Sequence, residues 1–397
     1  MARYGLPDNV EYCSICVMSN QKVTPSVVQK DKKESTKNTL IFKNGVCDAC
    51  RVHLNKSHEI DWLERKKKLE VLCSKYRKGN GEYDCIVPGS GGKDSVYQSI
   101  MLKEEFGMTP LTVTWAPHIY TDYGWRNFNR WINKGGCDNF LFTPNGEKHA
   151  LLTRLAYQNL LHPFQPFIFG QRNYVMHMAK KMDLKLIFFG ENPAEYGGFE
   201  GEDEMSSMAP MYYIDDDREN MKIAGLSFAE LYDQHGISEN DLKYYLPLTS
   251  QEASDLNLDP RWLGYYLKFH PQENYYFAQD KIGFEPNDQR TEGTYSRYNS
   301  LDDKTDGFHY WTGHIKFGVG RAMHEASQEV RNGELTREEG VELVKKYDGE
   351  FPQRYAQDFA DYIGLTLDEI LSIADSFRSE HLWKKIDGKW QLKHGIK

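Results

Sequence analysis

The sequence lacks long apolar runs and an excess of basic residues, and both absences restrict its function. No stretch approaches the ~18 consecutive apolar residues that span a membrane, and residues 1–10 contain no apolar segment typical of a signal peptide. Lys and Arg number 49 against 58 Asp and Glu, a net charge of -9, which argues against a general nucleic-acid binder. We therefore expect a cytoplasmic protein with no membrane insertion and no nucleic-acid partner.

Cysteine is also scarce, with seven residues in a chain of 397, and in a reducing compartment we expect no disulfide bonds. Four of them form two C-x-x-C pairs, Cys13 with Cys16 and Cys47 with Cys50. Two such turns supply four thiolates in the tetrahedral arrangement that zinc prefers. The alternative is a pair of redox-active motifs, but neither lies in a thioredoxin-like βαβ context. We predict a structural zinc ribbon over residues 1–58, with an exposed polar tip at 30–38.

The most informative segment is a glycine-rich turn that follows the apolar run 83–87. Its residues are Pro88, Gly89, Ser90, Gly91, Gly92, Lys93, Asp94 and Ser95. Glycine lets a backbone approach an anion closely, and the amides of the turn and of a following helix N-terminus donate hydrogen bonds to it. Lys93 adds a positive charge and the two serines add hydroxyl donors. The spacing differs from the Walker loop, yet it predicts a phosphate-binding loop.

Strands and helices alternate from residue 83 to residue 189. The predicted strands are 83–87, 111–115, 139–143 and 184–189, with helices near 125–134, 147–161 and 171–182. This alternation predicts an α/β fold with a doubly wound parallel sheet. Ligands bind beyond the carboxyl ends of such strands, so Thr114 and Trp115 join the loop as nucleotide-binding candidates.

The chain outside this sheet is divided by its composition. We expect a linker helix at 59–80, the loop-containing nucleotide domain at 81–215, and a substrate-binding, helical C-terminal region at 216–397. The alternation of strands and helices should stop near residue 215. Thr336 with Glu339, and Thr366 with Glu369, are plausible capping boxes at helix starts.

Glu191 is a candidate catalytic carboxylate because it follows the fourth predicted strand. At that position it would face the ligand crevice, where an acidic group either handles a proton or binds a metal ion. Glu195 is a second candidate. The alternative is that Glu191 caps a helix or is a solvated loop residue.

A third segment, 314–321, supplies two cations, Lys316 and Arg321, separated by glycines. This pattern suits a clamp that neutralises charge on a leaving pyrophosphate. The alternative is that both are surface cations around a turn. Just upstream, Asp302, Asp303 and Asp306 are interpreted as a solvated acidic loop, with magnesium or substrate binding as the alternative.

Taken in order, these motifs resemble the N-acetyl sugar amidotransferase family, which belongs to the PP-loop ATP pyrophosphatases. The shared segments are 12–18, 45–50, 60–62, 83–95, 190–198, 293–295, 315–321 and 347–349. There is one departure, because segment 162–170 has none of the cysteines that family members often carry there. This departure weakens any metal or thiol role for that segment.

The resemblance implies a reaction of surface-polysaccharide or lipopolysaccharide biosynthesis. An acetamido group on a sugar would become an acetamidino group, through an O-adenylyl intermediate and ammonia, with release of AMP and pyrophosphate. It implies ATP and Mg²⁺, with Asp94 on the magnesium, and Zn²⁺ on the four cysteines. Lys93, Lys316 and Arg321 would neutralise pyrophosphate, and Glu191 would assist ammonia. The implied partners are a separate glutaminase with a cyclase-like subunit and a free or nucleotide-linked N-acetyl sugar.

Two other functions stay open. One is a tRNA-modifying PP-loop enzyme that performs thiolation or lysidine-type ligation. Thiolation by a persulfide would have only Cys137 as a candidate, and the acidic charge disfavours tRNA. The other is a non-catalytic nucleotide-binding scaffold that holds partners through its zinc ribbon, which the intact phosphate loop disfavours.

Overall fold

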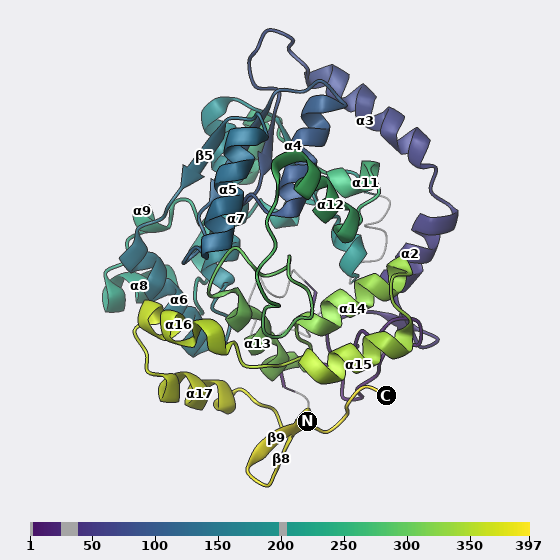
Figure 1. Ribbon diagram of the computed structural model, residues 1–397. Coiled ribbons are helices and arrows are strands. Elements are labelled where there is room, and N and C mark those ends of the chain that lie inside the picture. Colours follow the sequence, from purple (N-terminus) through teal and green to yellow (C-terminus); the bar gives the residue numbers. More distant parts are fainter. Residues whose placement is uncertain (1–2, 25–38, 198–204) are drawn as a thin grey trace.

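The computed structural model describes residues 3–24, 39–197 and 205–397, and a five-stranded parallel sheet forms its centre (Figure 1). The strands are β3 (Cys85–Pro88), β4 (Pro110–Trp115), β5 (Asn139–Phe142), β6 (Leu186–Phe189) and β7 (Asp259–Trp262). Their order across the sheet is β5-β4-β3-β6-β7. The predicted α/β class with a parallel sheet is confirmed.

The three inner strands, β4, β3 and β6, are buried on both faces of the sheet, to which their successive side chains point in turn. Ile86 and Ile187 lie in a hydrophobic cluster with two helices, α6 and α7, whereas Cys85 and Val87 lie in another with α3 and α4. The helices are α3 (Trp62–Tyr76), α4 (Lys93–Glu104), α5 (Asp122–Lys134), α6 (Gly146–Leu160) and α7 (Gln165–Met182). Strands buried on both faces require near-continuous apolar runs, and this is the predicted doubly wound arrangement.

The fifth strand, β7, corrects the expectation that the alternation stops near residue 215. It reads Asp-Pro-Arg-Trp, without the apolar run that marks the other strands. Proline is tolerated at a sheet edge, and β7 pairs along one side with β6 while a single bridge joins Arg261 to Ser207. The described residues of the connection from β6 form short elements: η1 (Pro193–Tyr196), η3 (Pro210–Tyr212), η4 (Arg218–Asn220), α8 (Phe228–His235), α9 (Glu239–Leu242) and α10 (Ser250–Leu256).

The chain after β7 is helical, as predicted, and ends in a hairpin. Its elements are α11 (Leu263–Tyr266), α12 (Pro271–Ile282), α13 (Asp306–Phe317), α14 (Arg321–Asn332), α15 (Arg337–Tyr347), η5 (Gln353–Tyr355), α16 (Ala356–Ile363), α17 (Leu367–Ser376), β8 (Trp383–Ile386) and β9 (Lys389–Leu392). The two predicted capping boxes are confirmed at the starts of α15 and α17.

The N-terminal region packs on the C-terminal helices. It contains the strand pair β1 (Phe42–Lys43) and β2 (Val46–Cys47), followed by α2 (Asp48–His58). Its four C-x-x-C cysteines share one hydrophobic cluster with Met323, Val341 and Val344 of α14 and α15, and the two termini lie at the same end of the molecule (Figure 1). The predicted tip at 30–38 lies outside the described residues.

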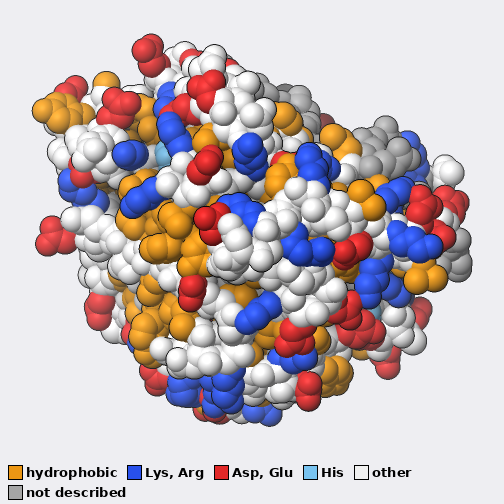
Figure 2. All heavy atoms as spheres, turned by 90° about the horizontal axis from the view of Figure 1, so that it is seen from above, with side chains coloured by type: hydrophobic (Ala, Val, Ile, Leu, Met, Phe, Trp, Pro, Cys, Tyr) orange, Lys and Arg blue, Asp and Glu red, His pale blue; other side chains and the backbone are white. Residues whose placement is uncertain are grey.

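Two expectations concern absences: that of a membrane-spanning segment and that of a nucleic-acid partner. Among residues 3–24, 39–197 and 205–397, no helix has the length and hydrophobicity needed to cross a bilayer. On the face shown in Figure 2, acidic and basic side chains are interspersed, with hydrophobic side chains between them. The absence of a nucleic-acid partner stays a prediction.

Candidate functional site

The phosphate loop and Glu191 lie at the carboxyl ends of neighbouring strands. β3 and β6 pair in parallel at the middle of the sheet. The chain leaves β3 toward one edge and β6 toward the other, and such a switch point opens the crevice where doubly wound sheets bind ligands. Loop 88–95 follows β3, and segment 190–192 follows β6. The structure therefore brings two of the predicted segments to one place.

The hydroxyl group of Ser95 holds the phosphate loop, whose last residues form the first turn of α4. The Gly91 amide donates to Ser95 Oγ at 3.1 Å, and that hydroxyl donates to the Gly92 carbonyl at 2.9 Å. Gly91 has a φ of +84°, and a Cβ there would lie 2.6 Å from Phe128 Cα, so only glycine fits. Gly92 is the N-cap of α4 and no side chain caps it. The first amides of this helix can therefore serve an anion.

Lys93 and Asp94 supply opposite charges at the start of α4. Lys93 is buried, and its Nζ lies 2.6 Å from Asp94 Oδ2. Asn274 of α12 donates to the other carboxylate oxygen of Asp94 at 2.8 Å. Asp94 thus holds the ammonium group of Lys93 at the loop, and a bound phosphate would compete with Asp94 for that group.

Glu191 interacts electrostatically with both charged groups of the loop. Burial and the Asp94 carboxylate raise the pKa of Glu191, whereas a hydrogen bond with Tyr196 and the charges of Lys93 and Arg321 oppose that rise. A carboxyl group with a raised pKa exchanges protons closer to neutral pH. Glu191 therefore interacts electrostatically with residues of two other predicted segments, 88–95 and 314–321.

Arg321 is fixed at the first position of α14. Its guanidinium donates to the Tyr310 hydroxyl and, at 2.5 Å, to Glu325 Oε1. Although burial opposes it, Tyr310, Glu325 and Asp306 raise the pKa of Arg321, so it stays charged. This partly buried cation is suited to an anionic ligand at the crevice.

Lys316 does not join Lys93, Glu191 and Arg321. This corrects the prediction that Lys316 and Arg321 form a two-cation clamp. Its Nζ donates to the Leu160 carbonyl at 2.6 Å and lies 5.1 Å from the ring centres of Tyr4 and Phe317. The reason is that α13 ends at Gly318 in the left-handed conformation and the chain then reverses into α14. Lys316 and Arg321 therefore lie on different helices.

Thr114 and Trp115 lie in the core behind the crevice. Thr114 is fully buried and accepts a hydrogen bond from Asn139 Nδ2 at 3.0 Å. The Trp115 ring packs 6.0 Å from His149 and 5.0 Å from Tyr245 between ring centres. Their assignment to nucleotide binding stays a prediction.

The acidic segment 302–306 is enclosed by the site, so its interpretation as a solvated loop is wrong. Ser90 of the phosphate loop donates to Asp302 Oδ2 at 2.6 Å, and burial raises the pKa of Asp302 to about 6. Asp303 Oδ2 accepts from the backbone amide of His118 at 2.7 Å and lies 2.9 Å from its Nδ1. Local composition predicts solvent exposure here, because it contains no information on the distant segments that enclose these residues.

Buried imidazoles form a group beside Asp303 that the sequence does not reveal. The rings of His118 and His149 stack with centres 4.9 Å apart, and burial lowers the pKa of His309 to about 4, with Arg321 adding to the effect. His118 Nε2, His149 Nε2 and His309 Nδ1 are buried and have no hydrogen-bond partner among the residues that the structure describes. Such atoms are rare in proteins unless water or a ligand satisfies them. Their wide separation in the sequence hides the group.

The four predicted cysteine ligands meet in the N-terminal region. All four are buried, and their sulfur atoms lie within 4.8 Å of one another. Cys13 Sγ lies 3.8 Å from Cys50 Sγ, and Cys16 Sγ lies 3.8 Å from Cys47 Sγ. Zn–S bonds of ~2.3 Å in tetrahedral geometry place sulfur atoms about 3.8 Å apart. The cluster therefore fits a zinc ion.

The cysteine cluster is connected to the loop that carries Glu191. Lys22 Nζ donates to the Tyr196 carbonyl at 2.6 Å, and Arg331 donates to the Glu195 carbonyl at 3.1 Å. Arg331 also interacts electrostatically with the cysteine thiolates. Four thiolates around a divalent ion have excess negative charge, which these cations balance. The same two cations therefore hold η1, whose Tyr196 contacts Glu191.

Comparisons with known proteins found similarities, and the family match lies in the C-terminal region. Residues 292–397 match the family model described as "LPS biosynthesis protein WbpG-like, C-terminal domain". Uncharacterized protein MJ1599 of Methanocaldococcus jannaschii is 32% identical over 101 residues, which cover 25% of this chain and 31% of that protein, so the match spans about a third of the relative. NMN synthetase from Francisella tularensis aligns with a TM-score of 0.34 and 10% identity over 78% of this chain and 98% of that chain.

The WbpG-like match includes part of the site. Residues Asp302, His309 and Arg321 lie inside the matched range 292–397. The C-terminal wall of the crevice is therefore similar to a domain of lipopolysaccharide biosynthesis proteins.

Proposed function

We propose that this protein is an ATP-dependent amidotransferase that converts the acetamido group of an N-acetyl sugar into an acetamidino group. The observation that carries the proposal is the meeting of the phosphate loop, Glu191 and Arg321 at the switch point of the sheet. The WbpG-like match supports a role in lipopolysaccharide biosynthesis. The loop sequence and its place before α4 support ATP as the activating substrate.

In the first step the amide oxygen of the sugar attacks the α-phosphate of ATP. The bond between the α-phosphorus and the oxygen that joins it to the β-phosphorus breaks. Pyrophosphate leaves, and an O-adenylyl imidate forms. The step is needed because an amide oxygen is a poor leaving group and AMP is a good one. Lys93, the first amides of α4 and Arg321 would stabilise the charge on pyrophosphate.

Asp94 and Asp302 are the residues that would hold a magnesium ion. Their carboxylates lie on the phosphate loop and against its Ser90, and carboxylate oxygens are the ligands that Mg²⁺ prefers. When bound, the ion would neutralise phosphate charge. The raised pKa of Asp302 fits a carboxylate that lacks a full counter-charge of its own.

In the second step ammonia attacks the imidate carbon. The new C–N bond forms, the C–O bond to AMP breaks, and Glu191 takes a proton from the attacking nitrogen. Tyr196 hydrogen-bonds Glu191 and would orient its carboxylate. We propose a separate glutaminase with a cyclase-like subunit as the source of ammonia.

The acceptor sugar would contact the buried imidazoles. His118 and His309 each have a buried ring nitrogen without a partner in the described parts of the chain, and His309 interacts electrostatically with Arg321. Neutral imidazoles can donate to or accept from sugar hydroxyl and amide groups. We propose a free or nucleotide-linked N-acetyl sugar as the acceptor.

The test is pyrophosphate release from ATP with magnesium and an ammonium salt. Nucleotide-linked N-acetyl sugars are screened against bulk tRNA, with Lys93→Ala as the inactive variant and Lys103→Ala, in the last turn of the same helix, as its matched control. We expect sugar-dependent release that Lys93→Ala abolishes, and replacement of one oxygen by NH in the sugar by mass. Release only with tRNA, or with neither, would refute the proposal.

A further inference from the structure

Segment 190–197, which carries Glu191, is attached at its two ends to different parts of the molecule. At its start, the Gly190 carbonyl accepts a hydrogen bond from the Gly264 amide of α11 at 2.8 Å. At its end, η1 and Gly197 lie against the N-terminal region and α14. Glu191 lies between these two attachments, so its position depends on both of them.

Two cations that interact with the cysteine cluster also hold the end of this segment. Lys22 lies between the two C-x-x-C pairs in the chain and is buried, and its Nζ donates to the Tyr196 carbonyl at 2.6 Å. Arg331 lies in the last turn of α14 and donates to the Glu195 carbonyl at 3.1 Å. Each of them also interacts electrostatically with cluster cysteines. The two cations therefore join the cluster to the backbone of η1 from two different elements.

The contact between the end of η1 and the cluster leaves no room for a side chain. Gly197 has a φ of +74°, and a Cβ there would overlap Asp48 Oδ1 and would lie 2.7 Å from Leu40 Cδ2. Asp48 follows Cys47 directly and begins α2. Because packed interiors transmit small shifts, a change in the turn that carries Cys47 and Cys50 would displace the end of η1.

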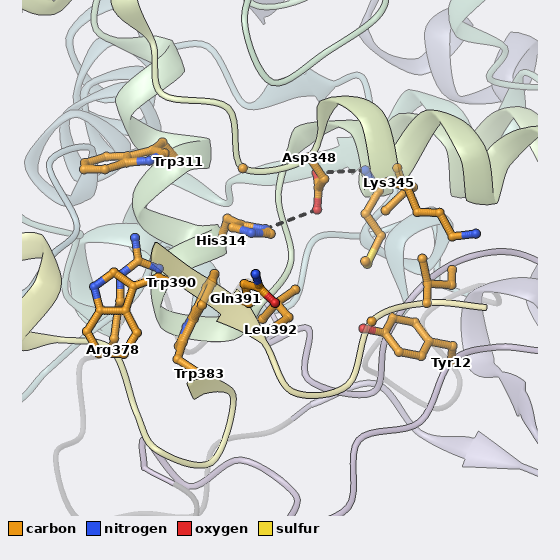
Figure 3. A pocket seen from close by; sticks show the side chains of 15 residues that line it. Tyr12, Trp311, His314, Lys345, Asp348, Arg378, Trp383, Trp390, Gln391 and Leu392 are labelled. Carbon is orange, nitrogen blue, oxygen red and sulfur yellow. Dashed lines mark hydrogen bonds and ion pairs between the residues drawn. The ribbon is translucent and has the colours of Figure 1, made fainter. Parts of the chain in front are cut away.

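Helix α14 extends the same connection to the phosphate site. It begins with Arg321 at the crevice and carries Arg331 in its last turn. Its start is held by Asp348, which accepts from the Gly320 amide at 2.9 Å and lies 3.3 Å from His314 Nδ1 (Figure 3). A single helix, fixed at its start, therefore spans from the crevice to η1 beside the cluster.

We propose that Lys22 and Arg331 are positioning residues that make the orientation of Glu191 depend on an intact cysteine cluster. Tyr196 provides the link, because Lys22 holds its backbone carbonyl and its side chain forms a hydrogen bond with Glu191. Removal of either cation leaves a carbonyl of η1 without that donor, which weakens the attachment of segment 190–197. A zinc ion on the four cysteines would hold together the two turns beside which these contacts lie.

Hydrogen–deuterium exchange and zinc content of the full chain test these roles. The variants are Lys22→Met and Arg331→Met, with Arg337→Met as the matched control. Arg337 donates to the Cys13 carbonyl at 3.3 Å and, among the described residues, to no part of segment 190–197. We expect amide exchange over 190–197 to become about tenfold faster in the two variants and to stay unchanged in the control, with zinc retained in all three.

The consequence for catalysis is measured separately and rests on the proposed function. Lys22→Met should lower formation of the amidino product about tenfold, because Glu191 is misplaced, and should change ATP–pyrophosphate exchange by less than about twofold. If no sugar supports pyrophosphate release, the proposed function fails, whereas the deuterium exchange over 190–197 still decides whether the two cations position this segment.

Three results would overturn the proposed positioning. In the first, amide exchange over 190–197 in both variants equals that of Arg337→Met. In the second, amide exchange rises by the same factor across the whole chain, which indicates a general loss of stability. In the third, Lys22→Met lowers both steps of the reaction equally. If Lys22→Met does not fold by circular dichroism, Arg331→Met decides each comparison, because the Arg331 side chain is only partly buried.

Discussion

The cysteine cluster and the phosphate site differ in how their parts are assembled. Each cluster ligand comes from a C-x-x-C turn, and the four sulfur atoms lie at the spacing of a tetrahedral ion. The phosphate site adds Asp302, Tyr196 and Arg321 from distant segments to one local loop. A local motif therefore identifies the whole cysteine cluster, but it identifies only part of the candidate site around the phosphate loop.

The two regions also balance charge differently. Buried Lys22 and partly buried Arg331 lie against the cluster, and each also holds the loop after Glu191. At the phosphate site, the carboxylates of Asp94, Glu191 and Asp302 gather around a single loop. Burial raises the pKa of Glu191 and of Asp302 among them. The cluster is thus suited to stability and the phosphate site to binding cations and anions together.

The largest expected effect comes from breaking the metal site. Cys16→Ser should lower the free energy of unfolding by at least about 3 kcal/mol, because loss of a structural metal is among the most destabilising changes. Thermal unfolding and zinc content by colorimetric chelation measure this. Cys137→Ser is the control, since Cys137 lies outside the cluster. Unchanged zinc content and melting in Cys16→Ser would contradict the metal site.

The next prediction compares the two cations of segment 314–321, Arg321 at the candidate site and Lys316 away from it. Arg321→Met should lower pyrophosphate release about 100-fold, because it removes a partly buried positive charge from the crevice. Lys316→Met should leave the rate per folded molecule unchanged and lower stability by about 1–2 kcal/mol, since its hydrogen bond to Leu160 is lost. Steady-state kinetics combined with urea unfolding separate the two effects. Equal kinetic losses would restore the two-cation clamp.

Glu191→Gln should divide the reaction into its two steps. The amide cannot take a proton from nitrogen, so we expect at least a tenfold loss of amidino product. ATP–pyrophosphate exchange with the sugar should continue, because adenylation does not need this carboxylate. Loss of exchange together with product would instead place Glu191 in adenylation or in magnesium binding.

These residues show how much the sequence predicts. Glycine spacing and C-x-x-C spacing locate the loop and the four cysteines because each is a local constraint. The apolar runs locate four of the five sheet strands, whereas β7 escapes because an edge strand can hold Pro260 and a charged residue. Asp302 and His309 are not predictable in this way, because their burial depends on contacts between segments distant in the chain.

A smaller effect is expected in the pH dependence of stability. The pKa of Asp302 is raised to about 6 in the folded protein, so folding favours its protonated form. Its contribution to stability is therefore complete below the unfolded pKa of ~3.9 and is lost as pH rises through about 6. Asp302→Asn should flatten the decline between these values, measured by thermal melting without magnesium. An identical decline in the variant would assign it to other groups.

The most direct test of the central claim follows the oxygen of the acetamido group. A sugar that supports pyrophosphate release is prepared with ¹⁸O in that carbonyl and incubated with ATP, magnesium and ammonium. If the phosphate-loop site adenylates the amide oxygen, the heavy oxygen must appear in the phosphate of AMP, and the sugar must carry nitrogen in its place. Heavy oxygen that stays in the sugar, or that appears in water, while AMP remains unlabelled would contradict the account.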